Sequence, residues 1–389
     1  MKILMINVVC GIRSTGRICT DLATALEAQG HDVKIAYGRE TVPAEFQKYA
    51  VKIGSNFDVK MHGIKARLFD AAGFGSKRAT KKLIKWVKEY DPDVIHLHNI
   101  HGYYINIEIL FAYLKTCGKK IVWTLHDCWA FTGHSAYCDM VNCEKWINGC
   151  NHCPQIRIYP KSFVDRSETN WLKKKKLLQN VPNLTIVTPS QWLADLVKQS
   201  FLSDYKVSVI HNGIDTSVFK PTESNFREKY GIKDKYIILG VSTAWSEMKG
   251  LSDYVNLAEA LDESYQVVLV GVTAEQKKEL PNKILTIERT NNIEELASIY
   301  SSSDLFVNLS YCENYPTVNL EAISCGTPVL TYKTGGSSES ALGGVIVERG
   351  NLSKVIEIIK SKPSMNEKLV FLSLDKSISN QKYISCIIN

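Results

Sequence analysis

The sequence has no run of about 18 or more consecutive apolar residues, so it predicts no membrane-spanning helix. Its start, MKILMINVVCGI, carries one lysine before a short apolar segment and predicts a buried strand rather than a cleaved leader. We therefore expect a cytoplasmic protein. In that compartment its 11 cysteines are expected to be free thiols or metal ligands rather than disulfides.

Two common nucleotide-binding patterns are also missing. No GxGxxG sequence occurs, which excludes the dinucleotide fingerprint. The loop GIRSTGR follows the first predicted strand, but relative to a P-loop Arg17 replaces the lysine and Ile18 replaces the hydroxyl that binds magnesium, so an NTPase is excluded. Basic and aromatic residues do not interleave as they do in RNA-recognition domains, so we expect no nucleic-acid partner.

What is present indicates two folded domains. At 389 residues and 45% hydrophobic, the chain can bury two ordinary cores. Apolar segments that end in polar turns alternate with helical patterns, which predicts an α/β fold of two Rossmann-like domains that face each other across a cleft. We place the first domain at residues 1–215 and the second at residues 221–375, with residues 376–389 as a tail that could return to the first. The net charge of +7 fits an anionic substrate or an anionic membrane surface.

The most informative pattern lies in residues 304–336. Two carboxylates, Glu313 and Glu321, stand eight positions apart, on either side of a predicted helix start. The amides around Thr317–Asn319 lack carbonyl partners within the helix and lie at the positive end of its dipole, so they favour an anion. Glu321, about one turn further on, would accept hydrogen bonds from a sugar diol such as a ribose. The alternative is a helix with one exposed glutamate and a loop with another.

The sequence ENYPTVNLEAISCGTPVLTYKTGG resembles the Glu-x7-Glu signature of the retaining nucleotide-sugar glycosyltransferases of family 4, which have the GT-B fold. The resemblance implies that Glu313 lies beside the donor sugar and that Glu321 binds the ribose. It further implies that the diphosphate is held by the run that follows Glu313, namely Asn314, Tyr315, Pro316, Thr317 and Val318. The segment VIHNGIDTSVFKP resembles the junction between the two domains of the family.

The same resemblance assigns roles to two loops of the first domain. In the family the loop after the first strand faces the donor diphosphate, which makes Gly16 and Arg17 expected contacts. A histidine in a later turn contacts the donor sugar, and in IVWTLHDCWAFTGH this is His126, next to Asp127. Ligands of open α/β sheets bind at the carboxyl ends of the strands, where both residues fall. The alternative for His126 is a structural histidine bonded to a nearby carboxylate.

In the second domain, Lys249 lies in the first loop between a strand and a helix, where it is expected to neutralise the leaving diphosphate. The family usually has an arginine five positions earlier, and this chain has Ala244 there. Arg17 or Arg289 is the expected replacement. The loop that begins at Arg289 also loosely resembles the base-contacting segment of the family.

Two clusters could bind metal. Four cysteines within a short stretch could close a structural zinc site, namely Cys138, Cys143, Cys150 and Cys153. A redox-active CxxC pair and unpaired structural cysteines are the alternatives. For His96, His98 and His101 we expect ordinary strand-end histidines, because no carboxylate at a suitable spacing joins them.

Four consecutive lysines, Lys173–Lys176, adjoin Trp171. A solvated helix face is the ordinary interpretation of such a run. Lysines near an anionic leaflet each contribute about 1 kcal/mol, so the run could instead attach the protein weakly to a membrane. Such attachment would suit a lipid-linked acceptor.

Together these patterns predict transfer of a hexose from a UDP- or GDP-linked sugar to a saccharide hydroxyl, with retention at the anomeric carbon. The resemblance implies a role in bacterial capsule, exopolysaccharide or colanic-acid-like synthesis at the inner face of the cell membrane, without a cofactor or metal for the chemistry. Three alternatives remain open: a nucleotide-sugar epimerase of the same fold, a non-catalytic nucleotide-binding module, and a glycoside hydrolase with two carboxylates.

Overall fold

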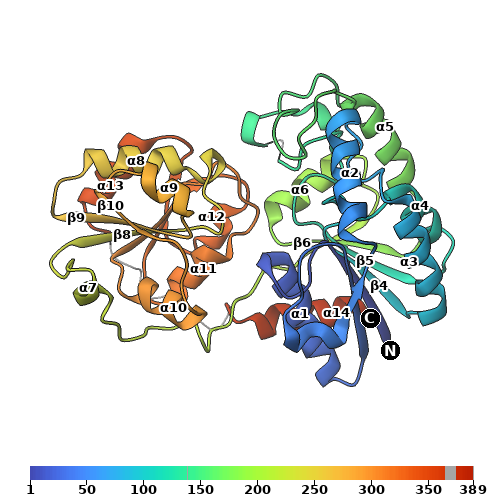
Figure 1. Ribbon diagram of the computed structural model, residues 1–389, viewed down its shortest axis with the longest axis horizontal. Helices are drawn as coiled ribbons and strands as arrows, with labels where there is room; N and C mark the ends of the chain where they lie inside the picture. The colour runs from blue at the N-terminus through green and yellow to red at the C-terminus, as the bar shows by residue number, and fades with distance from the viewer. Residues whose placement is uncertain (138, 364–373, 389) are drawn as a thin grey trace. The chain divides into compact units, whose positions relative to one another are not determined.

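The computed structural model describes residues 1–137, 139–363 and 374–388, and it divides the chain into two compact units (Figure 1). The first unit comprises Met1–His211 and Ser379–Asn389, and the second comprises Asn212–Ile378. Within the described residues no helix is long and apolar enough to cross a membrane.

The first unit is built on a sheet of parallel strands in the order β3-β2-β1-β4-β5-β6-β7. The strands are β1 (Lys2–Asn7), β2 (Asp32–Tyr37), β3 (Ala50–Lys52), β4 (Val94–Leu97), β5 (Lys120–Thr124), β6 (Leu184–Thr188) and β7 (Lys206–Val209). Successive side chains of a strand point to opposite faces. Accordingly, Ile3 and Met5 of β1 join one buried cluster, while Leu4 and Ile6 join another. The sheet is therefore buried on both faces.

Helices cover both faces of this sheet (Figure 1). They are α1 (Arg13–Ala28), α2 (Asn56–Phe69), α3 (Lys77–Tyr90), α4 (Ile107–Leu114), α5 (Ser167–Leu178), α6 (Gln191–Gln199) and α14 (Lys376–Ile388), with 3₁₀ segments η1 (Ala44–Tyr49), η2 (Asp139–Val141) and η3 (Lys145–Ile147). Tyr383 and Ile387 of α14 pack with Leu22 of α1 and with Met5. The C-terminal helix is thus part of the core of the first unit from Ser379 onward.

The second unit has a sheet of parallel strands in the order β10-β9-β8-β11-β12-β13. The strands are β8 (Tyr236–Val241), β9 (Tyr265–Val270), β10 (Ile284–Ile287), β11 (Leu305–Asn308), β12 (Val329–Lys333) and β13 (Val345–Glu348). Its helices are α7 (Phe226–Lys229), α8 (Leu251–Ala260), α9 (Ala274–Glu279), α10 (Ile293–Ser301), α11 (Thr317–Ser324), α12 (Ser337–Ser340) and α13 (Leu352–Lys360), with the 3₁₀ segment η4 (Glu247–Lys249). Buried clusters again lie on both faces of the sheet.

The strand order reverses beside the first strand of each sheet, because β1 lies between β2 and β4, and β8 lies between β9 and β11. Open parallel sheets bind ligands at such switch points, outside the carboxyl ends of the strands. The loops that follow β1, β4, β8 and β11 therefore occupy the positions where a site is expected. The predicted α/β class with two Rossmann-like domains is confirmed.

Candidate active site

In the second unit, the loop after β8 packs closely against the end of β11. Gly250 has a φ of 73°, and a Cβ atom there would lie 2.2 Å from the carbonyl oxygen of Leu309. The amide of Tyr311 also donates to the carbonyl of Met248 at 2.9 Å. Since only glycine allows this approach, the backbone at Gly250 determines which side chains of the two loops meet.

Lys249 and Glu313 meet at this contact. The Nζ of Lys249 donates to Oε1 of Glu313 in a close ion pair. The side chain of Glu313 is 13% exposed and that of Lys249 is 35% exposed, so part of the lysine side chain remains open to solvent. Two of the predicted catalytic residues, 64 positions apart in the sequence, are therefore neighbours. The pair offers a cation for a phosphate beside a carboxylate that can accept sugar hydroxyls.

Helix α11 begins beside this pair in sequence, and its N-terminus has no side-chain cap. The N-cap residue is Pro316, whose side chain makes no capping hydrogen bond. Thr317 and Val318 are partly exposed, whereas Asn314 and Tyr315 are buried. Because the first-turn amides have no partner within the helix, they can bind an anion.

The same loop is supported from the junction segment. Asn212 donates through Nδ2 to the carbonyl oxygen of Tyr315 at 3.2 Å. Asn308 donates to Oδ1 of the fully buried Asn319 at 3.0 Å, which attaches the first turn of α11 to the end of β11. The two segments with the strongest family resemblance are thus in direct contact within the second unit.

Glu321 lies one turn into α11 and is partly exposed. The Tyr300 hydroxyl donates to its Oε2 at 3.1 Å. Burial raises the pKa of Tyr300 well above its ordinary value, and the neighbouring Glu321 raises it further, so this tyrosine stays protonated and able to donate. Tyr300 therefore orients the predicted ribose-binding carboxylate. Sequence analysis missed it because nothing in the helical pattern of α10 distinguishes it from a core residue.

Two arginines are candidates for the missing positive charge in this unit. Arg289 is exposed after β10, and β9 lies between β10 and β8. Arg349, which follows β13, donates from Nη1 to the carbonyl oxygen of Tyr311 at 3.4 Å. The carbonyl that Arg349 contacts thus belongs to a residue two positions before Glu313, and sequence analysis did not identify this arginine. The role expected for Arg289 stays a prediction.

In the first unit, three histidines line the ends of β4 and β5. The Nδ1 of His98 lies 3.1 Å from Nε2 of His126, and Nε2 of His96 lies 2.8 Å from the Thr124 hydroxyl. Burial lowers the pKa of His126 to about 4, although the neighbouring Asp127 opposes this shift. Burial likewise lowers the pKa of His96 to about 3. His126 is therefore a neutral imidazole at neutral pH, which suits it to hydrogen bonding with a sugar hydroxyl.

A second hydrogen-bonded chain runs from Asp127 through His101 to Tyr159. His101 Nε2 donates to Oδ2 of Asp127 at 2.8 Å, and its Nδ1 lies 2.9 Å from the Tyr159 hydroxyl. Burial raises the pKa of Asp127, but His101 and a bond from the amide of Trp129 outweigh burial, so this pKa lies below its ordinary value. Asp127, the carboxylate next to His126 in the sequence, thus hydrogen-bonds His101. Tyr159 lies in a long loop without a recognisable pattern, so sequence analysis missed it.

The loop after β1 differs from expectation. Helix α1 begins at Arg13, so Gly16 lies inside the helix and is buried rather than in the turn before it. A Cβ atom at Gly16 would lie 3.0 Å from Val9 and 3.3 Å from the amide of Gly11, so this glycine allows α1 to pack against the loop. Arg17 is exposed. Contact of either residue with a diphosphate stays a prediction.

The cysteine cluster is only partly described, because Cys138 lies outside the described residues. Cys143, Cys150 and Cys153 are free and partly exposed. Burial raises the pKa of both Cys150 and Cys153 to about 11, so both are thiols at neutral pH. In the described part of the chain no three His, Cys, Asp or Glu side chains are arranged to hold a metal ion. A zinc site that includes Cys138 stays a prediction.

The lysine run Lys173–Lys176 is not uniformly exposed, so the prediction of a solvated helix face is wrong in part. Lys174 is buried and donates from Nζ to the carbonyl oxygens of Trp129 and Thr132, at 2.7 and 3.1 Å. Trp171 is also buried, and its indole donates to the carbonyl of Trp146 at 2.9 Å. Both side chains support the loop that follows His126 rather than a membrane contact.

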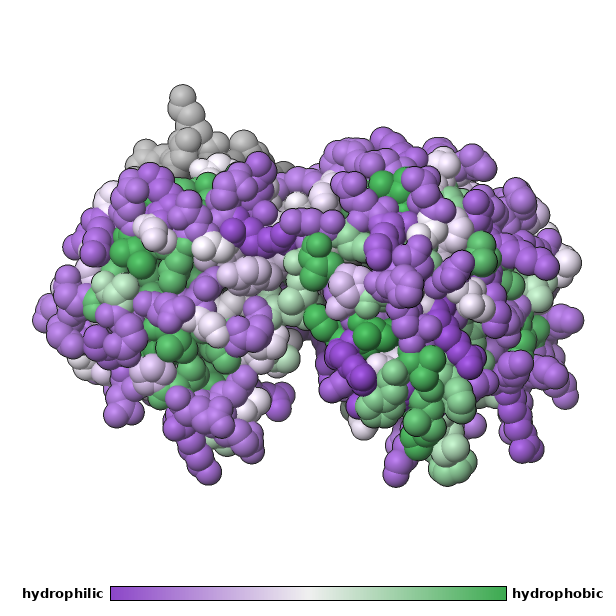
Figure 2. All heavy atoms as spheres, turned by 90° about the horizontal axis from the view of Figure 1, so that it is seen from above, coloured by the Kyte–Doolittle hydropathy of each residue, from purple (hydrophilic) through white to green (hydrophobic). Residues whose placement is uncertain are grey.

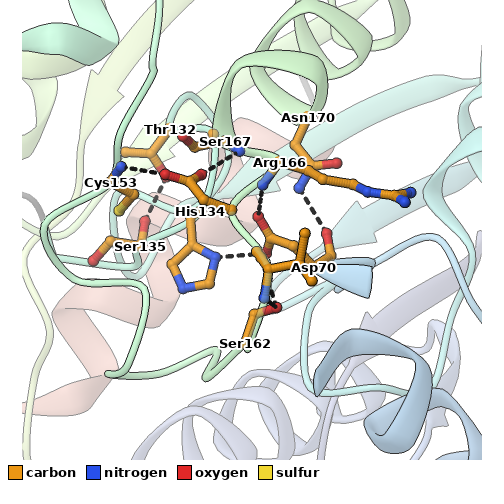
Figure 3. Close-up of polar contacts among 12 residues, drawn as sticks. Asp70, Thr132, His134, Ser135, Cys153, Ser162, Arg166, Ser167 and Asn170 are labelled. Atoms are coloured by element: carbon orange, nitrogen blue, oxygen red, sulfur yellow. Dashed lines mark hydrogen bonds and ion pairs between the residues drawn. The ribbon is translucent and has the colours of Figure 1, made fainter. Parts of the chain in front are cut away.

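Asp70, which follows α2, is the centre of another buried network (Figure 3). His134 donates from Nδ1 to one carboxylate oxygen at 2.6 Å, and the amide of Arg166 donates to the other at 3.0 Å. Asn170 of α5 donates to the Asp70 carbonyl at 2.7 Å. The end of α2 is thereby joined to α5 and to the loop that follows His126.

Comparison with known proteins identifies the family. A protein-family model described as Glycosyltransferase Family 4 matches residues 15–218, and a second family model, described as Glycosyl transferases group 1, matches residues 222–370. The chain is a family 4 glycosyltransferase. It is 25% identical to the putative colanic acid biosynthesis glycosyl transferase WcaC of Escherichia coli (strain K12), over 95% of this chain and 92% of that protein. It is also 26% identical to the D-inositol 3-phosphate glycosyltransferase of Arthrobacter sp. (strain FB24), over 54% of this chain and 58% of that protein.

Solved structures support the same fold for this glycosyltransferase. Anabaena Alr3699/HepE in complex with UDP-glucose has a TM-score of 0.68 at 15% identity, over 99% of each chain. Sucrose-phosphate synthase from Thermosynechococcus elongatus has a TM-score of 0.67 at 16% identity, over 100% of this chain and 95% of that one. The predicted GT-B fold is confirmed.

Proposed function

We propose that this glycosyltransferase moves a hexose from a UDP- or GDP-linked sugar to a saccharide hydroxyl, with retention at the anomeric carbon. The observation that carries the proposal is the Lys249–Glu313 pair next to the uncapped start of α11, with Glu321 one turn further. A cation and free amides suit a diphosphate, and the two carboxylates suit a sugar and a ribose. The complex of Anabaena Alr3699/HepE with UDP-glucose supports a UDP-linked donor.

In the proposed reaction the bond from the anomeric carbon to the diphosphate oxygen breaks, and a bond to the acceptor oxygen forms on the same face. Lys249 and the amides of Thr317 and Val318 stabilise the charge that develops on the diphosphate. The leaving phosphate oxygen takes the proton of the acceptor hydroxyl. Neutral His126 hydrogen-bonds the donor sugar, and Glu321 holds the ribose. No metal is required by these steps.

We further propose a lipid-linked acceptor in bacterial surface polysaccharide synthesis, used at the inner face of the cell membrane. The similarity to the putative colanic acid transferase WcaC over most of both chains supports a polysaccharide product. The positive net charge of +7 supports work near anionic lipids.

A thermal-shift screen with UDP-, GDP- and ADP-sugars tests the donor. A ligand at about 100 times its dissociation constant adds about 2.7 kcal/mol of stability. Glu321→Ala should abolish the shift caused by the best donor, while Glu259→Ala, which removes an exposed carboxylate paired with Lys283, should leave it unchanged. The absence of a shift with every donor would contradict the proposal.

Product analysis separates the other candidate functions. Donor conversion without an acceptor would indicate an epimerase, and saccharide cleavage without a nucleotide would indicate a hydrolase. His126→Ala should preserve donor binding and greatly reduce transfer. Donor binding with no turnover of any acceptor by the unmodified protein would indicate a binding module.

A further inference from the structure

Helix α2 presents an apolar stripe to solvent. Phe57, Met61, Ile64 and Leu68 are spaced by four, three and four residues, which places them on one side of a helix with about 3.6 residues per turn. All four are exposed, and Phe57 is 70% exposed. In Figure 2 a hydrophobic band projects from the first unit, at the lower right. An ordinary surface helix would place such residues toward the core.

The opposite side of α2 is fixed to the protein. His62 and Ala66 are buried, and Nε2 of His62 accepts from the amides of Gly73 and Gly75 at 3.2 and 3.0 Å. A capping box between Ser55 and Asp58 closes the start of the helix. The exposed stripe therefore belongs to a well-anchored helix that already has a buried face.

A neighbouring loop extends the stripe. The amide of Phe163 donates to the carbonyl of Arg67 at 2.8 Å, which holds this loop at the end of α2. Phe163 is 55% exposed, and Phe69 and Val164 are exposed beside it. We name the resulting surface the α2 patch, and it consists of Phe57, Met61, Ile64, Leu68, Phe69, Phe163 and Val164.

Cations surround the α2 patch. On the helix, Lys60 and Arg67 lie on one side of the stripe and Lys65 lies on the other, against the single carboxylate of Asp58. From the loop, the Arg157 guanidinium lies 5.4 Å from the Phe163 ring. Among the described residues, none of these four cations forms an ion pair within 4.0 Å. An apolar stripe flanked by unpaired cations matches the interfacial region of an anionic bilayer, where aromatic and aliphatic groups insert and cations contact phosphates.

We propose that the α2 patch docks the protein on an anionic lipid bilayer. Its apolar side chains enter the boundary between headgroups and acyl chains, while Lys60, Lys65 and Arg67 contact lipid phosphates. The inference deepens the proposed function and rests on it for its purpose, since a lipid-linked acceptor lies in such a surface. The Asp70 network joins the end of α2 to the loop after His126, so docking positions the acceptor side of the first unit (Figure 3).

Vesicle co-sedimentation of the full chain tests the proposal. The unmodified protein should bind phosphatidylcholine vesicles with about one third phosphatidylglycerol, and should bind pure phosphatidylcholine much more weakly. The variant F57S/I64S/L68S should reduce the partition coefficient about tenfold or more, because it removes the exposed apolar area. Ile346→Ser is the matched control, since Ile346 is a similarly exposed residue of the second unit, at 47%, and should leave binding unchanged.

Charge reversal gives an independent test that does not depend on the folding of the triple variant. K60E/K65E should lose binding to anionic vesicles about tenfold while keeping its thermal stability, because both side chains are exposed. Equal binding of the unmodified protein and both variants would overturn the proposal. A second outcome would also overturn it. If the unmodified protein fails to bind vesicles but forms a dimer in light scattering, and the triple variant abolishes that dimer, a second copy of the chain covers the α2 patch.

A transfer assay with a water-soluble saccharide acceptor distinguishes the two proposals. Without vesicles, F57S/I64S/L68S should transfer at the unmodified rate, because the α2 patch does not contribute to the donor site. Vesicle binding without transfer would overturn the proposed function and support docking. Transfer by the unmodified protein without any vesicle binding would overturn docking alone.

Discussion

At the residue scale, the contact between Lys249 and Glu313 matters most. A lysine that pairs with a carboxylate can exchange part of that pairing for a phosphate oxygen when a donor binds. Glu313 is mostly buried, so loss of this ammonium would leave a buried carboxylate without its ion-pair partner. In the proposed site, this ammonium would allow the carboxylate to lie near a diphosphate without repelling it.

Lys249→Ala should reduce kcat about 100- to 1,000-fold, because one preorganised electrostatic contact to the leaving diphosphate is lost. Steady-state kinetics with the best donor measures this effect. Lys277→Ala is the control, since Lys277 forms a comparable but exposed ion pair with Glu288 in the same unit. Equal kcat for both variants would show that Lys249 does not act on the diphosphate.

At the element scale, the approach of η4 to the end of β11 brings the pair together. Gly250 has a positive φ and no room for a Cβ atom. Any other residue at this position would therefore suffer both backbone strain and a clash with the backbone of Leu309. Gly231 has a similar φ of 66° but has nothing within 4 Å of its Cβ position. A comparison of substitutions at these two glycines therefore separates the effect of backbone strain from the effect of close packing.

Gly250→Ala should therefore destabilise the protein by more than Gly231→Ala, which should cost about 1 kcal/mol from backbone strain alone. Gly250→Ala should also lower kcat, since the clash at this position would separate Lys249 from Glu313. Urea unfolding and donor kinetics measure the two effects. If Gly250→Ala matches Gly231→Ala in both measurements, the close approach of the two loops does not support the site.

At the scale of the whole molecule, the two units differ in their titratable residues. All nine histidines lie in the first unit. Burial lowers the pKa of His62 to about 4 and that of His96 to about 3. A histidine whose folded pKa is depressed stabilises the protein fully above its unfolded pKa of about 6.5, and this stability is lost as pH falls toward the folded value.

The first unit should accordingly lose stability between pH 6.5 and about pH 4, by on the order of 3 kcal/mol for His62 alone. Residues 212–378 contain no histidine, so the second unit should lose no stability by this mechanism. Hydrogen exchange at pH 7 and pH 5, corrected for the intrinsic rates, should show loss of protection in β4 and β5 and little change in β8 and β11. Equal loss of protection in both units would contradict the expectation.

Short-range patterns were sufficient for the fold and for part of the site. The alternation of apolar strands and helices predicted two Rossmann-like domains, and α11 begins at Thr317, where the first turn of the predicted helix was placed. Glu313 and Glu321 were found because both flank one helix start. Such features depend on local periodicity, turn residues and helix ends, which a sequence contains directly.

Only the tertiary structure decided which distant residues meet. The contacts of Lys249 with Glu313, of Tyr300 with Glu321 and of His101 with Asp127 depend on strand order and on loop packing. The same reason explains why the burial of Lys174 within the lysine run was not predicted. The apolar stripe of α2 was hidden for a related reason, because periodicity identifies an apolar side of a helix but not whether that side faces the core or the solvent.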